Sequence, residues 1–254
     1  MKKIIVTAFA LCLISSPLFA AESGNKYPLP DVDFSFDGPF GTYDRASLQR
    51  GFQVYKQVCA ACHALDLVSY RNLADLGYNE DEVKAIASQY AIMDGPNDEG
   101  EMFERNRRPS DRFVNPYPND KAARYANNGA YPPDMSLLAK ARKDGPTYIY
   151  GVLTGYKDAP EGVELTEGQY YNKHMAGNKI AMAAPLFDGM VAYEDDAPQT
   201  MEQYSKDVST FLMWSAEPKM EERKRMGFKV IIFLMAFAGI MYAVKKKIWK
   251  DLHD

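Results

Sequence analysis

The sequence predicts a mainly α-helical exported domain with long loops, followed by one membrane-spanning helix. The chain has 254 residues, of which 46% are hydrophobic and 25% are charged, as is usual for a globular protein. Apolar residues recur at helical spacing, no strand pattern stands out, and one long apolar run lies near the C-terminus. These observations exclude a mainly disordered chain and a polytopic membrane protein. A pI near 5.5 also argues against nucleic acid as the main partner.

The N-terminal segment, residues 1–20, has the three parts of a secretory signal peptide. Two lysines are followed by an apolar stretch, and small residues suited to cleavage end the segment. A first transmembrane helix is the alternative, but the apolar stretch is short for a span and Pro17 interrupts it. We therefore expect residues 1–20 to be removed and residues 21–222 to form a periplasmic domain.

The exported part is expected to combine helices with long irregular linkers. The clearest helix has Leu48, Phe52 and Tyr55 on one face. Irregular backbone buries little apolar surface by itself, so a large flat cofactor would supply the apolar core around which the linkers pack. The expected helices are 47–58, 80–90, 133–140 and 202–213, with 147–153 either helical or extended, and the linkers are 94–100, 107–119 and 158–178.

The apolar run at residues 228–244 predicts a membrane helix. It has about 17 residues, at the short end of the spanning range. A buried core helix is the alternative, but a core helix should show a polar face and this segment shows none. Three lysines follow the run and predict a cytoplasmic C-terminus. We expect an anchor helix at 223–245 and a cytoplasmic tail at 246–254.

The motif Cys59-Ala-Ala-Cys62-His63 is the attachment signature of c-type haem. Two thiols three positions apart on a helical turn can form thioethers to the two vinyl groups of one macrocycle, and the following imidazole can bind the iron. Cys12 lies in the signal segment, so the mature chain has only these two cysteines. A redox-active C-x-x-C, a zinc site and a structural disulfide are the alternatives; the first lacks a βαβ context and the second lacks two ligands.

Electron transfer requires a sixth ligand to the iron. Met182 stands in an apolar stretch of small residues that Pro185 ends, and ligation by Met raises the iron's potential. A methionine that fills a gap in the core is an equally good interpretation of this pattern. Met175 and His174 are the other candidates, and His174 would give a bis-His haem of lower potential.

Beyond the attachment motif, a series of short motifs resembles the cytochrome c1 family. The resemblance runs from about Gly51 to the membrane helix and preserves the order of the motifs, which makes it far more specific than C-x-x-C-H alone. The matching stretches are 50–63, 94–97, 100–103, 116–119, 126–130, 132–134, 153–156, 180–183, 216–218 and 223–227.

This resemblance implies a mainly α, cytochrome-c-like haem domain with long loop insertions, plus one C-terminal transmembrane helix. It implies a subunit of the cytochrome bc1 complex (ubiquinol–cytochrome c reductase) of the respiratory chain, and no enzyme by itself. The subunit would carry electrons from the Rieske iron–sulfur protein to a soluble or anchored cytochrome c, with cytochrome b as a further partner. The simple signal peptide resembles a bacterial member, so we expect the bacterial inner membrane.

The resemblance also implies the residues of the site. Some bacterial members of the family carry an extra disulfide near the Met ligand, and this chain lacks the cysteines for one. How the Met182 loop is held is therefore an open question. The implied site is one haem c attached covalently to Cys59 and Cys62, iron ligation by His63 and Met182, Arg142 and Tyr148 at the propionates, and Asn127, Pro133 and Pro185 lining the pocket.

Negative charge is concentrated in the exported part. Residues 21–216 hold 19 Lys and Arg against 29 Asp and Glu, a net charge of −10, whereas the whole chain carries −4. A basic partner could dock electrostatically, and the alternative is an ordinary solvated face. The candidate contacts are Asp94, Asp98, Glu99, Glu101, Glu104 and residues 194–196.

Overall fold

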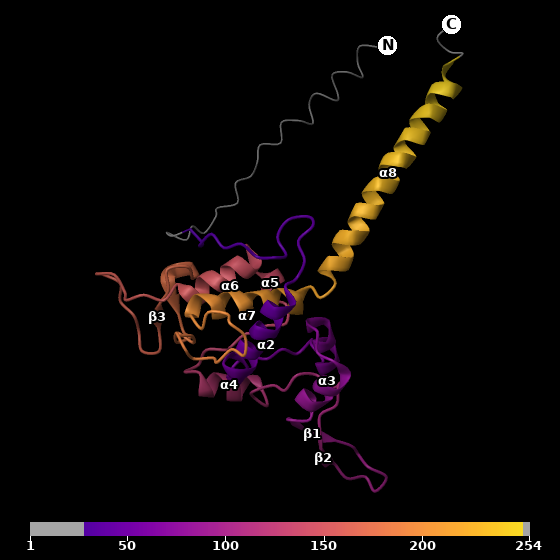
Figure 1. Cartoon of the computed structure of the whole chain (residues 1–254). Coiled ribbons are helices and arrows are strands. Elements are labelled where there is room, and N and C mark those ends of the chain that lie inside the picture. Colours follow the sequence, from indigo (N-terminus) through magenta and orange to yellow (C-terminus); the bar gives the residue numbers. More distant parts are fainter. Residues whose placement is uncertain (1–27, 251–254) are drawn as a thin grey trace, which may run out of the picture.

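The computed structural model describes residues 28–250 and shows a helical domain from which one long helix projects (Figure 1). The predicted signal segment and the last four residues lie outside the described residues. The helices are α2 (Arg45–Gln57), α3 (Glu80–Ala87), α4 (Asp120–Ala126), α5 (Leu138–Ala141), α6 (Gly145–Thr154), α7 (Met201–Ala216) and α8 (Met220–Ile248). The strands are β1 (Ala91–Asp94), β2 (Phe103–Asn106), β3 (Tyr170–Tyr171) and β4 (Lys179–Ile180).

Helices α2 and α7 pack against each other at the centre of the domain. At Gly51 the two backbones come so close that a Cβ atom would lie 2.1 Å from the carbonyl oxygen of Asp207. Phe52 and Phe211 extend this contact, with ring centroids 5.8 Å apart. The α2–α7 crossing therefore depends on a residue without a side chain at position 51.

A buried carboxylate, Asp207, joins α7 to α2. Its side chain accepts hydrogen bonds from the Ser47 hydroxyl (2.6 Å), Arg50 Nε (2.8 Å) and the Tyr193 hydroxyl (3.0 Å). Arg50 also pairs with Asp195 at 2.6 Å. A charge buried this deeply requires such partners, so this cluster fixes the α2–α7 pair in one arrangement.

The structure confirms most of the expected helices and corrects their ends. The segment 147–153, left open between helix and strand, lies within α6. The prediction of a helix over 133–140 was wrong, because only Leu138–Ala141 is helical. The Asp134 carboxylate accepts a hydrogen bond from the Ser136 backbone N–H at 2.9 Å, a turn that competes with helix formation.

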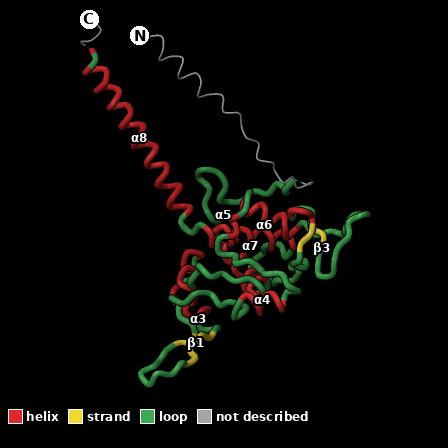
Figure 2. The backbone as a smooth tube through the Cα atoms, turned by 180° about the vertical axis from the view of Figure 1, so that it is seen from behind, coloured by secondary structure: helices red, strands yellow, loops and turns green. Residues whose placement is uncertain are grey.

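Two short antiparallel strand pairs and helix α4 were not predicted. The pair β1–β2 sets Asp94 opposite Phe103, and the pair β3–β4 sets Tyr170 opposite Ile180. These strands are two to four residues long, so an alternating pattern has too few positions to stand out. The β1–β2 hairpin projects from the end of the domain opposite α8 (Figures 1 and 2).

Helix α8 extends away from the domain in both views (Figures 1 and 2). Its 29 residues have a mean hydropathy of 2.1 over the most apolar stretch, and none of that stretch is buried. The core-helix alternative is therefore excluded. At 1.5 Å per residue the helix is about 43 Å long, which is enough to cross a bilayer. Glu221 secures its base by accepting a hydrogen bond from the Tyr43 backbone N–H (2.8 Å) and pairing with Arg45 (3.0 Å).

Candidate functional site: a haem attachment turn

The two motif cysteines lie on one tight turn that follows α2. A 3₁₀ turn spans Cys59–Ala61. The backbone N–H groups of Cys62 and His63 both donate to the carbonyl oxygen of Cys59, at 3.1 and 2.9 Å. Both thiols and the imidazole are therefore carried by a single hydrogen-bonded turn, as the spacing of the motif predicts.

The His63 ring is oriented by a backbone carbonyl. Its Nδ1 atom lies 2.8 Å from the carbonyl oxygen of Pro133. With the proton on Nδ1, the ring donates this hydrogen bond and keeps the lone pair of Nε2 for a metal. Burial lowers the pKa of His63, which favours the neutral ring that metal binding requires. The Tyr55 hydroxyl also donates to the His63 carbonyl oxygen, at 3.2 Å.

Cys59 does not have the properties of a reactive thiol. Both are free thiols. Burial, followed by the neighbouring Cys62, raises the pKa of the Cys59 thiol to about 12, whereas a reactive thiol has a lowered pKa. Within residues 28–250, no group of three or more His, Cys, Asp or Glu side chains could hold a metal ion. The environment of the turn therefore argues against the thiol oxidoreductase and zinc alternatives.

Met182 is partly buried against the same apolar core that Cys59 contacts. Its carbonyl oxygen accepts a hydrogen bond from the Tyr156 hydroxyl at 3.0 Å. Two residues earlier, Ile180 pairs with Tyr170 in the β3–β4 ladder. The Met182 loop is thus tied to the domain at two points, without a disulfide.

The two other ligand candidates pack against α6. His174 is only 3% exposed, and a Cβ atom on Gly155 would lie 2.9 Å from its Cδ2 atom. The sulfur of Met175 accepts a hydrogen bond from the Tyr148 hydroxyl at 3.2 Å. Each of these side chains therefore has a structural role of its own beside α6.

The remaining predicted site residues differ in their surroundings. The Arg142 side chain is exposed at the surface and donates to the carbonyl oxygen of its neighbour Ala141 at 3.3 Å. Asn127 uses its amide within the protein, donating to the Tyr117 hydroxyl (3.0 Å) and the Ala123 carbonyl oxygen (2.7 Å). Pro185 is half-buried, whereas Pro133 is exposed and contributes its carbonyl to His63.

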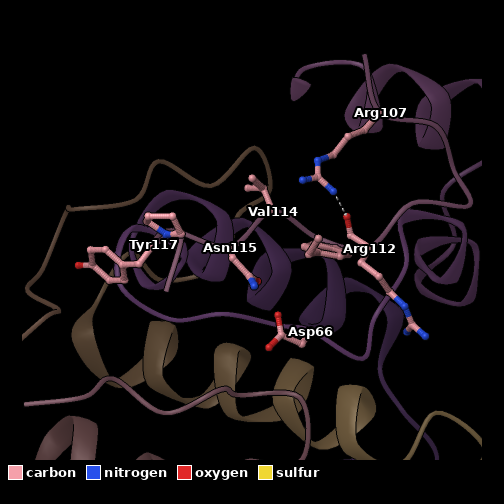
Figure 3. Close-up of a pocket in the computed structure, with 8 residues that line it drawn as sticks. Asp66, Arg107, Arg112, Val114, Asn115 and Tyr117 are labelled. Carbon is pink, nitrogen blue, oxygen red and sulfur yellow. Dashed lines mark hydrogen bonds between the residues drawn. The ribbon is translucent and has the colours of Figure 1, made fainter. Parts of the chain in front are cut away.

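A polar cavity of about 450 Å³ lies beside the segment that follows the attachment turn (Figure 3). Asp66 lines it, and Arg107 donates across one side to the Arg112 carbonyl oxygen at 2.8 Å. A second cavity, of about 490 Å³, includes Tyr156 and Ala184 and so adjoins the Met182 loop. The sequence pattern predicts neither cavity, because their walls come from segments distant in the chain.

Comparison with known proteins decides the family. The Cytochrome C1 family matches residues 34–252, which is most of the chain. The chain belongs to the cytochrome c1 family. The resemblance inferred from the ordered motifs is thereby confirmed, together with the mainly α fold that it implied.

Similar cytochromes c1 occur in bacteria and plants. The chain is 51% identical to the cytochrome b/c1 of Bradyrhizobium diazoefficiens over 98% of its own length, but it spans only 39% of that protein. It is 49% identical to the mitochondrial heme protein cytochrome c1 1 of Arabidopsis thaliana, with 95% of this chain and 79% of that protein covered. It is 42% identical to the cytochrome c1 of Rhodospirillum rubrum, with 99% of this chain and 97% of that protein covered.

Two contacts of the candidate site were not predicted from the sequence. The Tyr156 hydroxyl, which donates to the Met182 carbonyl oxygen, lies in a motif to which the sequence pattern assigned no role in the site. Pro133 was expected to line the pocket, and the structure shows in addition that its carbonyl oxygen contacts Nδ1 of His63. Both contacts join residues far apart in the chain, so no local spacing signals them.

Proposed function

We propose that this chain is the haem-bearing subunit of a cytochrome bc1 complex, carrying electrons from the Rieske iron–sulfur protein to a cytochrome c. The observation that carries the proposal is the attachment turn, in which His63 is oriented by Pro133 at 2.8 Å. This turn belongs to a chain of the cytochrome c1 family. The chain would be an electron-transfer subunit of ubiquinol–cytochrome c reductase and no enzyme by itself.

The described residues fit one covalently attached haem. Cys59 and Cys62 lie on the same turn as free thiols, and Nδ1 of His63 has its partner while Nε2 is left for iron. When bound, haem supplies one-electron oxidation and reduction. We assign thioether attachment to Cys59 and Cys62, axial ligation to His63 and Met182, propionate contacts to Arg142 and Tyr148, and the pocket wall to Asn127, Pro133 and Pro185.

The work of the protein in this function is positioning and electrostatics. Outer-sphere electron transfer needs neither a general base nor a nucleophile. Cys59 and Met182 are both partly buried and pack against one apolar core, which would lower the local dielectric constant beside the haem. A thioether ligand in such surroundings favours the reduced iron and raises its potential. An exposed guanidinium such as Arg142 can turn toward a propionate, because guanidinium–carboxylate hydrogen bonds are strong and directional.

The subunit would sit in the bacterial inner membrane with its haem domain in the periplasm. The length of α8 and the exposure of its most apolar stretch support a single span, and the three lysines at its end support a cytoplasmic C-terminus. Cytochrome b and the Rieske protein would be its partners in the complex. The name of the Bradyrhizobium relative, cytochrome b/c1, supports cytochrome b as one of them.

Purification of the full chain from membranes in a mild detergent tests this assignment. We expect a b-type cytochrome and an iron–sulfur protein to co-purify, and the reduced haem to resist carbon monoxide because Met182 closes the sixth position. A chain with Cys59 and Cys62 replaced by Ser is the control for haem-dependent assembly. Elution of the chain alone, with a haem that binds carbon monoxide, would instead support a gas-binding protein and contradict the proposal.

A further inference from the structure

We propose that Tyr156 is a positioning residue for the axial ligand, holding the Met182 loop through a hydrogen bond from its hydroxyl to the Met182 carbonyl oxygen. The oxygen–oxygen distance is 3.0 Å. The inference rests on the proposed ligation of iron by Met182. It answers the question of what holds this loop in a chain whose three cysteines, Cys12, Cys59 and Cys62, cannot form a disulfide beside it.

The Met182 loop needs support from outside itself. Ala181, Ala183 and Ala184 are exposed, so the stretch around Met182 buries little surface of its own. The nearest residues that are anchored to the domain are Ile180, paired with Tyr170 in the β3–β4 ladder, and Leu186, which is 5% exposed. The bond from Tyr156 reaches the loop between these two points, at the backbone of the ligand residue itself.

Tyr156 comes from a rigid part of the domain. It follows α6 directly, and its backbone forms a β-bridge with Asn172. The Asn172 side chain is completely buried; it donates to the Val152 carbonyl oxygen at 2.7 Å and accepts from the His174 backbone N–H at 3.0 Å. The backbone of Tyr156 is therefore held by neighbours that are themselves hydrogen-bonded, which restricts the position of its hydroxyl as a positioning group requires.

The direction of this hydrogen bond follows from its two partners. A backbone carbonyl can only accept, so the hydroxyl of Tyr156 must donate in this pair. Neither a hydroxyl nor a carbonyl carries a formal charge, so the contact does not depend on a charged side chain.

The Tyr156→Phe variant tests the inference in the full-length haem protein in detergent. Ferric haem with a Met ligand has a weak near-infrared charge-transfer band, and rising pH replaces the thioether. Loss of one hydrogen bond should favour dissociation of Met182 about two- to tenfold. We therefore expect the variant to keep its covalent haem and to lose the band at a pH lower by roughly 0.3 to 1 unit.

Tyr150→Phe is the matched control. Tyr150 is half-buried on α6 and packs against the core. This variant therefore also removes one tyrosine hydroxyl from the same region of the domain, but it leaves the hydrogen bond to the Met182 carbonyl oxygen intact. We expect its titration to match that of the unaltered protein. Equal titrations for Tyr156→Phe and Tyr150→Phe would overturn the inference while leaving the ligand assignment intact.

The Met182→Leu variant tests the ligation of iron by Met182 separately from the positioning role of Tyr156. If Met182 is the ligand, this variant lacks the band at every pH. A band that persists in Met182→Leu would overturn the ligand assignment, and the inference about Tyr156 would fail with it.

Discussion

The His63 ring, the proposed axial ligand, is oriented by a single backbone atom. Proline has a fixed φ angle, so the direction of the chain around the Pro133 carbonyl is restricted. That carbonyl holds Nδ1 of His63 at 2.8 Å, while the hydrogen-bonded turn from Cys59 fixes the backbone of the same residue. The protein itself thus orients the ring from two directions, which would reduce the reorganisation that binding of iron requires.

The Met182→Leu substitution tests whether Met182 is the second axial ligand of the iron. We expect the haem to remain attached through Cys59 and Cys62, because the thioethers do not depend on the sixth position. The midpoint potential should fall by on the order of 0.1 V or more, within the roughly 0.8 V over which axial ligands tune haem. Redox potentiometry of the purified variant measures this, and an unchanged midpoint would remove Met182 as a ligand.

The attachment half of the site is predictable because its chemistry is local. Cys59, Cys62 and His63 lie within five residues, and their spacing already specifies one turn. Met182 is far from the attachment motif in the sequence. The residues around it are equally compatible with an axial ligand and with a methionine of the core, and only the order of the family motifs favours the ligand. The contact from Tyr156 to Met182 could not be predicted, since it joins the segments that follow α6 and β4, 26 residues apart in the chain.

Helices α2 and α7 provide the frame on which the attachment turn is built. The turn follows the last residues of α2, so any displacement of α2 moves Cys59 and His63 together. The close contact at Gly51 and the buried Asp207 cluster hold α2 against α7. Stability of this crossing and geometry of the site are therefore coupled.

The Gly51→Ala substitution should weaken the crossing. A Cβ atom at 2.1 Å from a backbone oxygen forces the two helices apart, and overpacking of this kind costs about 1 to 3 kcal/mol. Thermal or denaturant unfolding of the haem domain measures the loss. Gly227→Ala is the control, because a Cβ there meets no atom within 4 Å and alanine favours a helix. Equal stability of the two variants would contradict the account of the crossing.

The β1–β2 hairpin is attached to the domain by a charge network. Arg105 pairs with Asp111 at 2.6 Å and also with Asp94. The hydrogen bond from Arg105 lowers the pKa of Asp111 to about 2, below the value of about 4 expected in the unfolded chain. Because the folded pKa is the lower one, this interaction stabilises the fold above pH 4 and is lost as the pH falls toward 2.

The Asp111→Asn variant tests this pH dependence. It should be less stable than the unaltered protein at neutral pH, and the difference should shrink as the pH falls from about 4 to about 2. Unfolding measured at several pH values in this window provides the comparison. A stability difference that does not vary with pH would show that the Asp111 charge contributes nothing.

The elements that the sequence predicts well are those with several helical turns. Helices α2, α7 and α8 are long enough for apolar spacing to stand out. Short elements escape this kind of reasoning: β1–β2 relies on the Arg105 network, and α4 on the Asn119 side chain, which accepts from the Ala122 backbone N–H at 3.0 Å. The pattern predicts a helix over 133–140, but the turn at Asp134 replaces its first part and only Leu138–Ala141 is helical.

The two ends of the molecule differ in charge: α8 carries basic residues at both of its ends, and the hairpin at the opposite end of the domain is acidic. The hairpin opposite α8 carries exposed carboxylates at Asp98, Glu99, Glu101 and Glu104 (Figure 1). Two of the acidic residues considered for docking are already paired within the protein: Asp94 with Arg105, and Asp195 with Arg50. The hairpin tip is therefore the better candidate for attracting a basic partner.

Neutralising Asp98, Glu99 and Glu101 to Asn or Gln should slow encounter with a basic cytochrome c. We expect the association rate at low ionic strength to fall by about tenfold, and the difference to vanish at high salt. Stopped-flow electron transfer measures this rate. The matched control neutralises Glu161, Glu164 and Glu167, three exposed carboxylates on another loop. An equal effect of both triple variants would show that only net charge matters and would exclude a docking role for the hairpin.

Peptide mass spectrometry of the chain purified from membranes tests whether one haem is bound covalently at the attachment turn. We predict that the proteolytic peptide containing Cys59–His63 carries the added mass of a single haem after denaturation, and that no other peptide does. The same peptide recovered with two unmodified thiols, or with a disulfide, from membranes that make c-type cytochromes would contradict the account.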